Sequence, residues 1–169
     1  MKLIFLSFIL LFLTTTFGFS QQKSQTIDQD TTPVTLFEKR YIDSYEKNIK
    51  KSRIKGVYIP KNLDEAYQEL LALSPSASIE KFKNAEKEFV VGRLHYGLGR
   101  WMVLNWNFYD GSRYSHFLKN LGLSHPDDMA RFTLLAFHDY LNNLEPDIDA
   151  TVKKLVEERK MIFEKQRKN

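Results

Sequence analysis

The sequence has no cysteine among its 169 residues. Disulfide bonds, cysteine-containing zinc sites, thiol nucleophiles and lipid-modified cysteines are therefore excluded. Any fold must be stabilised by its hydrophobic core alone. Hydrophobic residues make up 43% of the chain, and a chain of this length can bury a sizeable core.

A strong charge of either sign is also absent. The formal net charge is only +4, because 21 acidic residues nearly balance 25 basic ones. This balance indicates neither a nucleic-acid partner nor a dedicated anionic surface. The aromatic content of 14% is more distinctive and indicates an aromatic-rich core or contact surface.

Motifs of known catalytic or nucleotide-binding sites are missing as well. No G-x-S-x-G nucleophile elbow occurs, and Met102 stands where "YGLGRW" would need its third glycine for a dinucleotide fingerprint. The four histidines show no zinc-ligand spacing; they are His95, His116, His125 and His138. We therefore expect no metal and no cofactor, and the sequence gives no positive sign of an enzyme.

The first 20 residues have the layout of a cleavable secretory signal. Lys2 precedes the apolar run "LIFLSFILLFL", and small residues follow at Gly18 and Ser20. The run is shorter than the about 20 residues of a membrane span, so an uncleaved anchor is only the alternative. We expect export to the periplasm or the outside of the cell, with no transmembrane span after cleavage. Residues 21–33 are polar and predict a disordered spacer.

Helical spacing dominates the rest of the chain. Residues 34–53 predict an amphipathic helix, and "IKGVYIP" predicts a short extended connector. Asn62 is a good helix N-cap, with Glu65 as its capping-box partner. After the break at "SPSAS", one or two helices are expected, loosened near Gly97 and Gly99.

The C-terminal half predicts a turn at "DG" and three further helices. A short helix begins near Ser112 and ends at Gly122, a mostly buried helix follows "SHPDD", and a charged helix closes the chain. With no repeats and no long alternating pattern, the fold class is all-α: a small helical bundle of about five to six helices. The expected segments are a signal peptide (1–20), a spacer (21–33), an N-terminal helix and connector (34–56), a core domain (57–144) and a charged C-terminal helix (145–169).

The motif "SHPDD" is first of all a helix start. Proline suits the first helical turn, and Ser124 or His125 would provide the N-cap. Asp127 and Asp128 would then lie beside the free N–H groups, where the helix dipole stabilises each by about 0.3–1 kcal/mol.

Six residues form the candidate ligand or partner surface: Trp101, Asn105, Arg113, His125, Asp127 and Asp128. Arg113 begins a helix and can grip an anion, or it can form an ion pair with Asp127 or Asp128. Trp101 and Asn105 are i, i+4 neighbours, which indicates either core packing or an aromatic groove for a peptide, sugar or apolar ligand. Bracing of two helices is the favoured interpretation of the Arg–Asp pair.

Four segments together resemble a bacterial family, domain of unknown function 6794. They are "VYIPKNLDEAYQEL", "LHYGLGRWMVLNW", "GSRYSHFLKNLGLSHPDDM" and "HDYLNN", and they span Val57 to Leu144. The chain departs from the family pattern at Val103 and Leu104, which replace a polar pair, and at Phe108 and Tyr109. The resemblance implies a domain boundary and no activity.

Three functions remain open on the sequence alone. The favoured one is a secreted or periplasmic binding module for a protein or small-molecule partner. The alternative is a hydrolase-like enzyme with a His/Asp centre, with or without a metal ion, in which His125 or His95 acts as base beside Asp127 or Asp128. A structural or chaperone-like envelope protein that docks through its C-terminal helix is the third.

Overall fold

The computed structural model describes residues 35–168. The predicted signal peptide and spacer lie outside these residues. Among the described helices, none combines the length and apolar character needed to cross a membrane.

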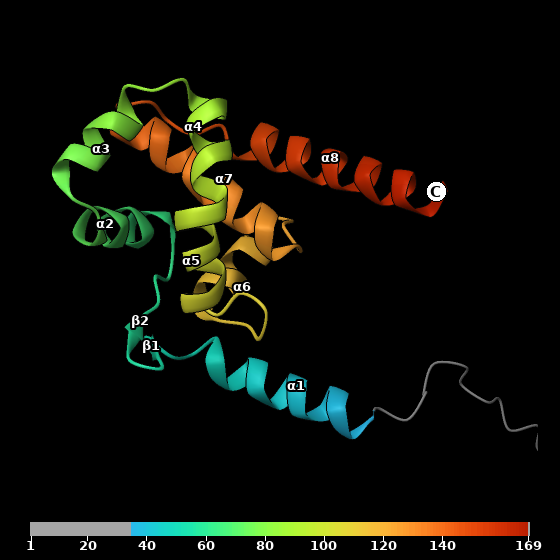
Figure 1. Cartoon of the computed structure of the whole chain (residues 1–169). Helices are drawn as coiled ribbons and strands as arrows, with labels where there is room; N and C mark the ends of the chain where they lie inside the picture. The colour runs from blue at the N-terminus through green and yellow to red at the C-terminus, as the bar shows by residue number, and fades with distance from the viewer. Residues whose placement is uncertain (1–34, 169) are drawn as a thin grey trace, which may run out of the picture. The chain divides into compact units, whose positions relative to one another are not determined.

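The described part of the chain is all-α apart from one small hairpin, and the predicted all-α fold class is confirmed (Figure 1). In chain order the elements are α1 (Leu36–Asn48), β1 (Arg53–Ile54), β2 (Val57–Tyr58), α2 (Leu63–Leu73), α3 (Ser76–Lys83), α4 (Lys87–Leu94), the π-helix η1 (His95–Gly99), α5 (Arg100–Asn105), α6 (Arg113–Asn120), α7 (Pro126–Leu141) and α8 (Ile148–Lys168). The predicted connector is in fact the antiparallel hairpin β1–β2, in which Arg53 pairs with Tyr58. Two-residue strands are too short to leave an alternating pattern in the sequence.

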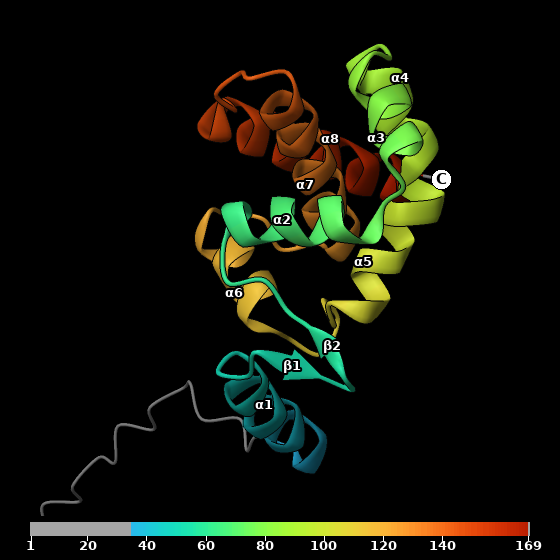
Figure 2. The same ribbon diagram turned by 90° about the vertical axis from the view of Figure 1, so that its left-hand side faces the viewer.

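Helix α7 lies at the centre of the core. Its side chains are buried on nearly every side, including Met129, Phe132, Leu134 and Phe137. Helices α2 to α6, η1 and α8 all contact it (Figures 1 and 2). A helix covered all round needs an apolar sequence all round, which explains why the run after "SHPDD" lacks a polar stripe.

Local capping signals set most helix boundaries. The Asn62 side chain accepts a hydrogen bond from the Glu65 backbone N–H at 3.1 Å, and Ser112 forms a full capping box with Ser115 at the start of α6. Gly122 ends α6 with φ +106°, as expected for a glycine at C′. The predicted capping-box role of Glu65 is wrong, because its carboxylate instead accepts hydrogen bonds from Lys61 N–H and the Tyr58 hydroxyl.

The loosening predicted near Gly97 and Gly99 is a π-helix. Helices α4, η1 and α5 follow one another as a single helical column beside α7 (Figure 1). Gly99 is buried, and a Cβ there would lie 3.4 Å from His95 Nδ1 and 3.7 Å from Leu134 Cδ1. The π-helical turn therefore packs closely on α7 at Gly99, whereas Tyr96 and Arg100 are exposed to solvent. Short π-helical segments occur frequently at functional sites.

Candidate functional site

The surface is hollowed where η1, the first turn of α7 and α8 meet. One hollow, of about 300 Å³, is lined by His95, Tyr96, Arg100 and Asp127, and we call it the π-turn pocket. A second hollow, of about 340 Å³, adjoins it along α8, and we call it the α8 groove. The α8 groove is lined by Gly92, His95, Tyr96, Asp127, Asp128, Arg131, Glu158, Arg159 and Ile162.

The start of α7 places Asp127 at both hollows. His125 is the N-cap, and its Nδ1 accepts a hydrogen bond from the Asp127 backbone N–H at 3.2 Å. Pro126 occupies the first turn, so the helix-start interpretation of "SHPDD" is confirmed, with His125 rather than Ser124 as cap. The Asp127 side chain is 38% exposed, and its Oδ2 lies 3.9 Å from His125 Nδ1. Its carboxylate therefore remains open to solvent.

Asp128 has a structural role instead. Both of its carboxylate oxygens accept hydrogen bonds from the Arg159 guanidinium, with Nε–Oδ2 at 2.9 Å, so the pair is bidentate. The Asp128 side chain is only 13% exposed. The hydrogen bonds that Arg159 donates to Asp128 raise the pKa of Arg159, even though burial acts to lower it. Asp128 thus braces α7 against α8, with Arg159 rather than Arg113 as its partner.

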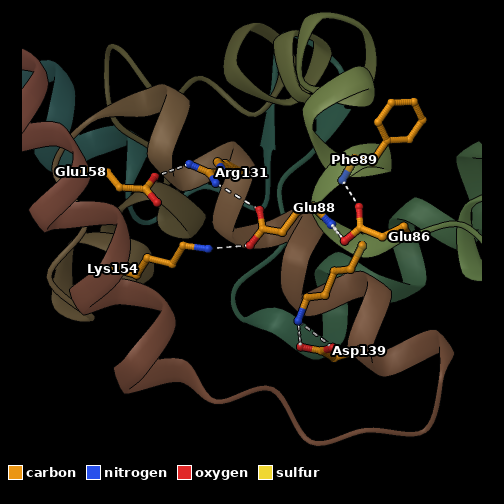
Figure 3. Close-up of polar contacts among 8 residues, drawn as sticks. Glu86, Glu88, Phe89, Arg131, Asp139, Lys154 and Glu158 are labelled. Carbon is orange, nitrogen blue, oxygen red and sulfur yellow. Dashed lines mark hydrogen bonds and ion pairs between the residues drawn. The ribbon is translucent and has the colours of Figure 1, made fainter.

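A second set of ion pairs holds α8 to α4 and α7 (Figure 3). Arg131 of α7 pairs with Glu158 of α8 and with Glu88 of α4, and Lys154 Nζ lies 2.6 Å from Glu88 Oε1. The hydrogen bond from Lys154 lowers the pKa of the Glu88 carboxyl. These charges pair with one another across three helices, and Arg131 and Glu158 of this set line the α8 groove.

In the π-turn pocket, by contrast, the charge of Arg100 is not balanced by a described carboxylate, whereas Asp127 lies near His125 and acts electrostatically on Arg159. Arg100 makes no ion pair within residues 35–168, and its guanidinium has one hydrogen bond there, a 3.5 Å contact with the exposed Tyr109 hydroxyl. Tyr96 is 86% exposed and lies edge-on to the His95 ring at 5.4 Å between centroids. His95 Nδ1 is buried with no hydrogen-bond partner among the described groups. The pocket therefore presents a guanidinium, a carboxylate, a phenol and an imidazole to whatever enters it.

Arg113 lies in a different place and braces α6 against the hairpin and α2. Its Nε donates to the Ile59 carbonyl at 2.6 Å, its Nη2 donates to Glu65 Oε2 at 3.2 Å, and its guanidinium stacks over the Tyr58 ring at 5.0 Å. Burial acts to raise the pKa of the Glu65 carboxyl, but hydrogen bonds from Lys61 and Tyr58 outweigh burial and lower the pKa to about 2.

Trp101 and Asn105 are also outside both hollows. The Asn105 side chain donates to the Trp101 carbonyl at 2.9 Å, and the Trp101 ring packs edge-on against the buried Trp106 at 5.9 Å. This is the core-packing arrangement. Of the six predicted surface residues, the structure brings only Asp127 and Asp128 to the hollows, with His125 as the cap beside them.

Sequence reasoning missed Tyr96, Arg100, Arg131 and Arg159 as site residues. The first two flank the glycines of "HYGLGR", so a polar residue on either side of a predicted helix irregularity was a usable signal. The two arginines left no local signal, because their carboxylate partners lie 27 and 31 residues away along the chain.

Among the described residues, no hydrogen bond joins a histidine to a carboxylate in the way that the predicted His/Asp catalytic centre would require. The Nδ1 of His125 is occupied as a helix cap, and the described part of the chain shows no hydrogen bond between His95 and a carboxylate. Within residues 35–168, no three His, Asp or Glu side chains gather closely enough to hold a metal ion. The hydrolase alternative stays a hypothesis.

Comparison with protein-family models assigns the central part of the chain to a family. Residues 59–141 match the model of a domain of unknown function, DUF6794, close to the predicted span of 57–144. No match was found among curated proteins or among solved structures. The matched span includes all four residues of the π-turn pocket, whereas Glu158 and Arg159 of α8 lie beyond it. Residues 59–141 of this chain therefore form a domain of the DUF6794 family.

Proposed function

We propose that this protein is a binding module that takes a small polar ligand in the π-turn pocket. One observation carries the proposal: Arg100 and Asp127 carry opposite charges, line the same hollow of about 300 Å³, and form no ion pair with each other. A volume near 300 Å³ is at the lower end for small-molecule sites, which suits a compact ligand.

The two charges define what such a ligand must carry. A guanidinium offers a planar fork of N–H donors that matches a carboxylate or phosphate group. The Asp127 carboxylate accepts hydrogen bonds from an ammonium or hydroxyl group. The best complement is a small molecule with an anionic group at one end and a hydrogen-bond donor at the other, such as an amino acid or a hydroxy acid.

The other two side chains would support the ligand between these ends. Tyr96 provides a largely exposed ring and hydroxyl, and His95 provides a second ring held at its buried edge against Gly99. All four side chains project from helical backbone, which positions binding groups more accurately than a loop. The ion pairs that fasten α8 to α4 and α7 hold the neighbouring wall in place.

We propose further that binding takes place outside the cytoplasm, because residues 1–20 have the layout of a cleavable secretory signal. Mass spectrometry of the protein recovered from the cell envelope or the medium tests this directly. A chain that begins at Gln21 is expected. Recovery of the intact chain from the cytoplasm alone would contradict export.

A thermal-shift screen tests the binding function. The panel consists of amino acids, hydroxy acids, dicarboxylates and phosphorylated sugars, and the proteins are the wild type, Arg100→Ala, Asp127→Asn and the control Arg93→Ala. Arg93 is an exposed arginine of α4 that lines neither hollow. At least one compound should raise the melting temperature of the wild type and the control, because ligand binding stabilises the folded state, and should have little effect on the two pocket variants.

The screen can also reject the proposal. A compound that stabilises all four proteins equally binds elsewhere, and a panel without any stabilising compound contradicts a small polar ligand of this class. Chemical conversion of a stabilising compound during incubation would instead support the hydrolase alternative.

A further inference from the structure

A further cavity, of about 240 Å³, lies between α3, the α4–η1 column and α7, apart from the two hollows described above. Its walls are mainly apolar, formed by Ile79, Phe82, Leu94, Leu98 and Phe137, with serine hydroxyls near them. We propose that this cavity is a binding site for a small uncharged apolar molecule, an aromatic ring of up to two fused rings being the best fit.

The sequence explains why apolar side chains are left without a protein partner here. Helix α2 ends at Leu73, and Pro75 forces a break before the short helix α3 begins. Helix α3 buries Phe82 against α7, but Ile79, one turn earlier, remains only partly buried. On the facing column, Leu94 ends α4 and Leu98 lies within the π-turn, and both are also only partly buried. A ligand between them would remove three aliphatic side chains from water.

The chemistry of the walls selects a neutral ligand. Within residues 35–168, no charged side chain lines the cavity, and the only polar side chains that line it are the hydroxyls of Ser74 and Ser78. An ionised group placed there would lose its hydration without gaining a partner of opposite charge. The π-turn pocket, lined by Arg100 and Asp127, shares none of its lining residues with this cavity.

The size and the aromatic floor indicate the kind of molecule. Phe82 and Phe137 lie with their rings 5.8 Å apart and 21° from parallel. Aromatic rings favour offset-stacked or edge-on contacts at such separations. An apolar cavity of about 150 Å³ is enough to hold benzene in a protein core. A cavity of about 240 Å³ therefore has room for a larger ring system, for which indole is a convenient probe.

Titration of the purified protein with indole, followed by NMR of its side-chain methyl groups, tests the proposal. The key pair of variants is Ser78→Trp, which fills the mouth of the cavity, and Ala77→Trp, which adds the same side chain at an exposed position of α3 that does not line it. We expect saturable binding to the wild type and to Ala77→Trp, with shifts at the methyl groups of Ile79 and Leu98. Binding to Ser78→Trp should be at least about tenfold weaker.

Two further measurements keep the test decisive. Tryptamine, which carries a cationic amine on the same ring system, should bind the wild type at least about tenfold more weakly than indole. Ile79→Phe fills the cavity from within and should also abolish binding. This variant replaces Ser78→Trp in the test if Ser78→Trp does not fold. Equal binding of indole to Ala77→Trp and Ser78→Trp, or no saturable binding to the wild type, would overturn the proposal.

Discussion

Replacing Gly111 by alanine should disrupt the contact between the N-terminal helix α1 and the DUF6794 domain (residues 59–141). Gly111 has φ +86°, and a Cβ at this position would lie 2.1 Å from Cδ2 of Tyr45 on α1. The Tyr45 ring must therefore leave its place. In the native position, the Tyr45 hydroxyl is hydrogen-bonded to His116 Nδ1 at 3.0 Å, and Lys119 Nζ lies 4.4 Å from the centroid of the Tyr45 ring.

The destabilisation has two parts that can be separated. The left-handed backbone costs an alanine about 1–2 kcal/mol whether or not Tyr45 is present. Displacing Tyr45 removes a hydrogen bond of about 0.5–1.5 kcal/mol and a cation–aromatic contact of about 0.5–1 kcal/mol. Gly111→Ala should thus cost about 2–4.5 kcal/mol in the wild type and only about 1–2 kcal/mol in a Tyr45→Ala background.

Urea unfolding of the wild type, Gly111→Ala, Tyr45→Ala and the double variant, followed by tryptophan fluorescence, measures both free-energy costs. The buried Trp106 reports the unfolding of the domain. The double-mutant cycle should give a coupling free energy of about 1 kcal/mol or more between positions 45 and 111. The same cost for Gly111→Ala in both backgrounds would show that the Tyr45 ring does not lie over Gly111 and that α1 does not pack there.

Three other predictions concern the braces and caps. Asp128→Ala should lower the free energy of unfolding by about 1.5–3 kcal/mol by removing the bidentate pair with Arg159, whereas the neighbouring Asp127→Ala should cost less than about 1 kcal/mol. Equal losses in urea unfolding would contradict the separate roles of the two carboxylates. Ser112→Ala should cost about 1 kcal/mol by removing the α6 cap, and circular dichroism melting of the variant would show no change if the cap is unimportant. Because the pKa of Glu65 is lowered to about 2 in the folded state, its stabilising effect is complete above about pH 5 and is lost as the pH falls toward 2. The stability difference between wild type and Glu65→Gln should therefore shrink over that range, and a difference independent of pH would argue against the depressed pKa.

The helix boundaries were predictable because their causes are local. Asn62, Ser112, Gly122 and Pro126 each act on backbone groups within about four residues, so a single segment of sequence contains both the cause and the effect. The helix break at Pro75 and the loosening at the paired glycines belong to the same class.

The site was harder to predict because it depends on distant partners. Arg113 and Asp128 were both expected to brace helices, and both do, but to Glu65 and Arg159 rather than to each other. Their ion-pair partners lie 48 and 31 residues away along the chain. Which partner each side chain meets depends on how the helices pack and not on the neighbouring residues. The glycines signalled an irregular helix, but the sequence does not show that Gly99 packs against α7 while the exposed Tyr96 and Arg100 line a pocket with Asp127.

The central claim is that Arg100 and Asp127 together bind a small polar ligand. Isothermal titration of the most stabilising compound from the screen into the wild type, Arg100→Ala, Asp127→Asn and Arg93→Ala tests it most directly. Since a charged hydrogen bond contributes about 1.5–3 kcal/mol, each pocket variant should raise the Kd at least about tenfold, and Arg93→Ala should leave it unchanged. A Kd that is the same for all four proteins would contradict the claim.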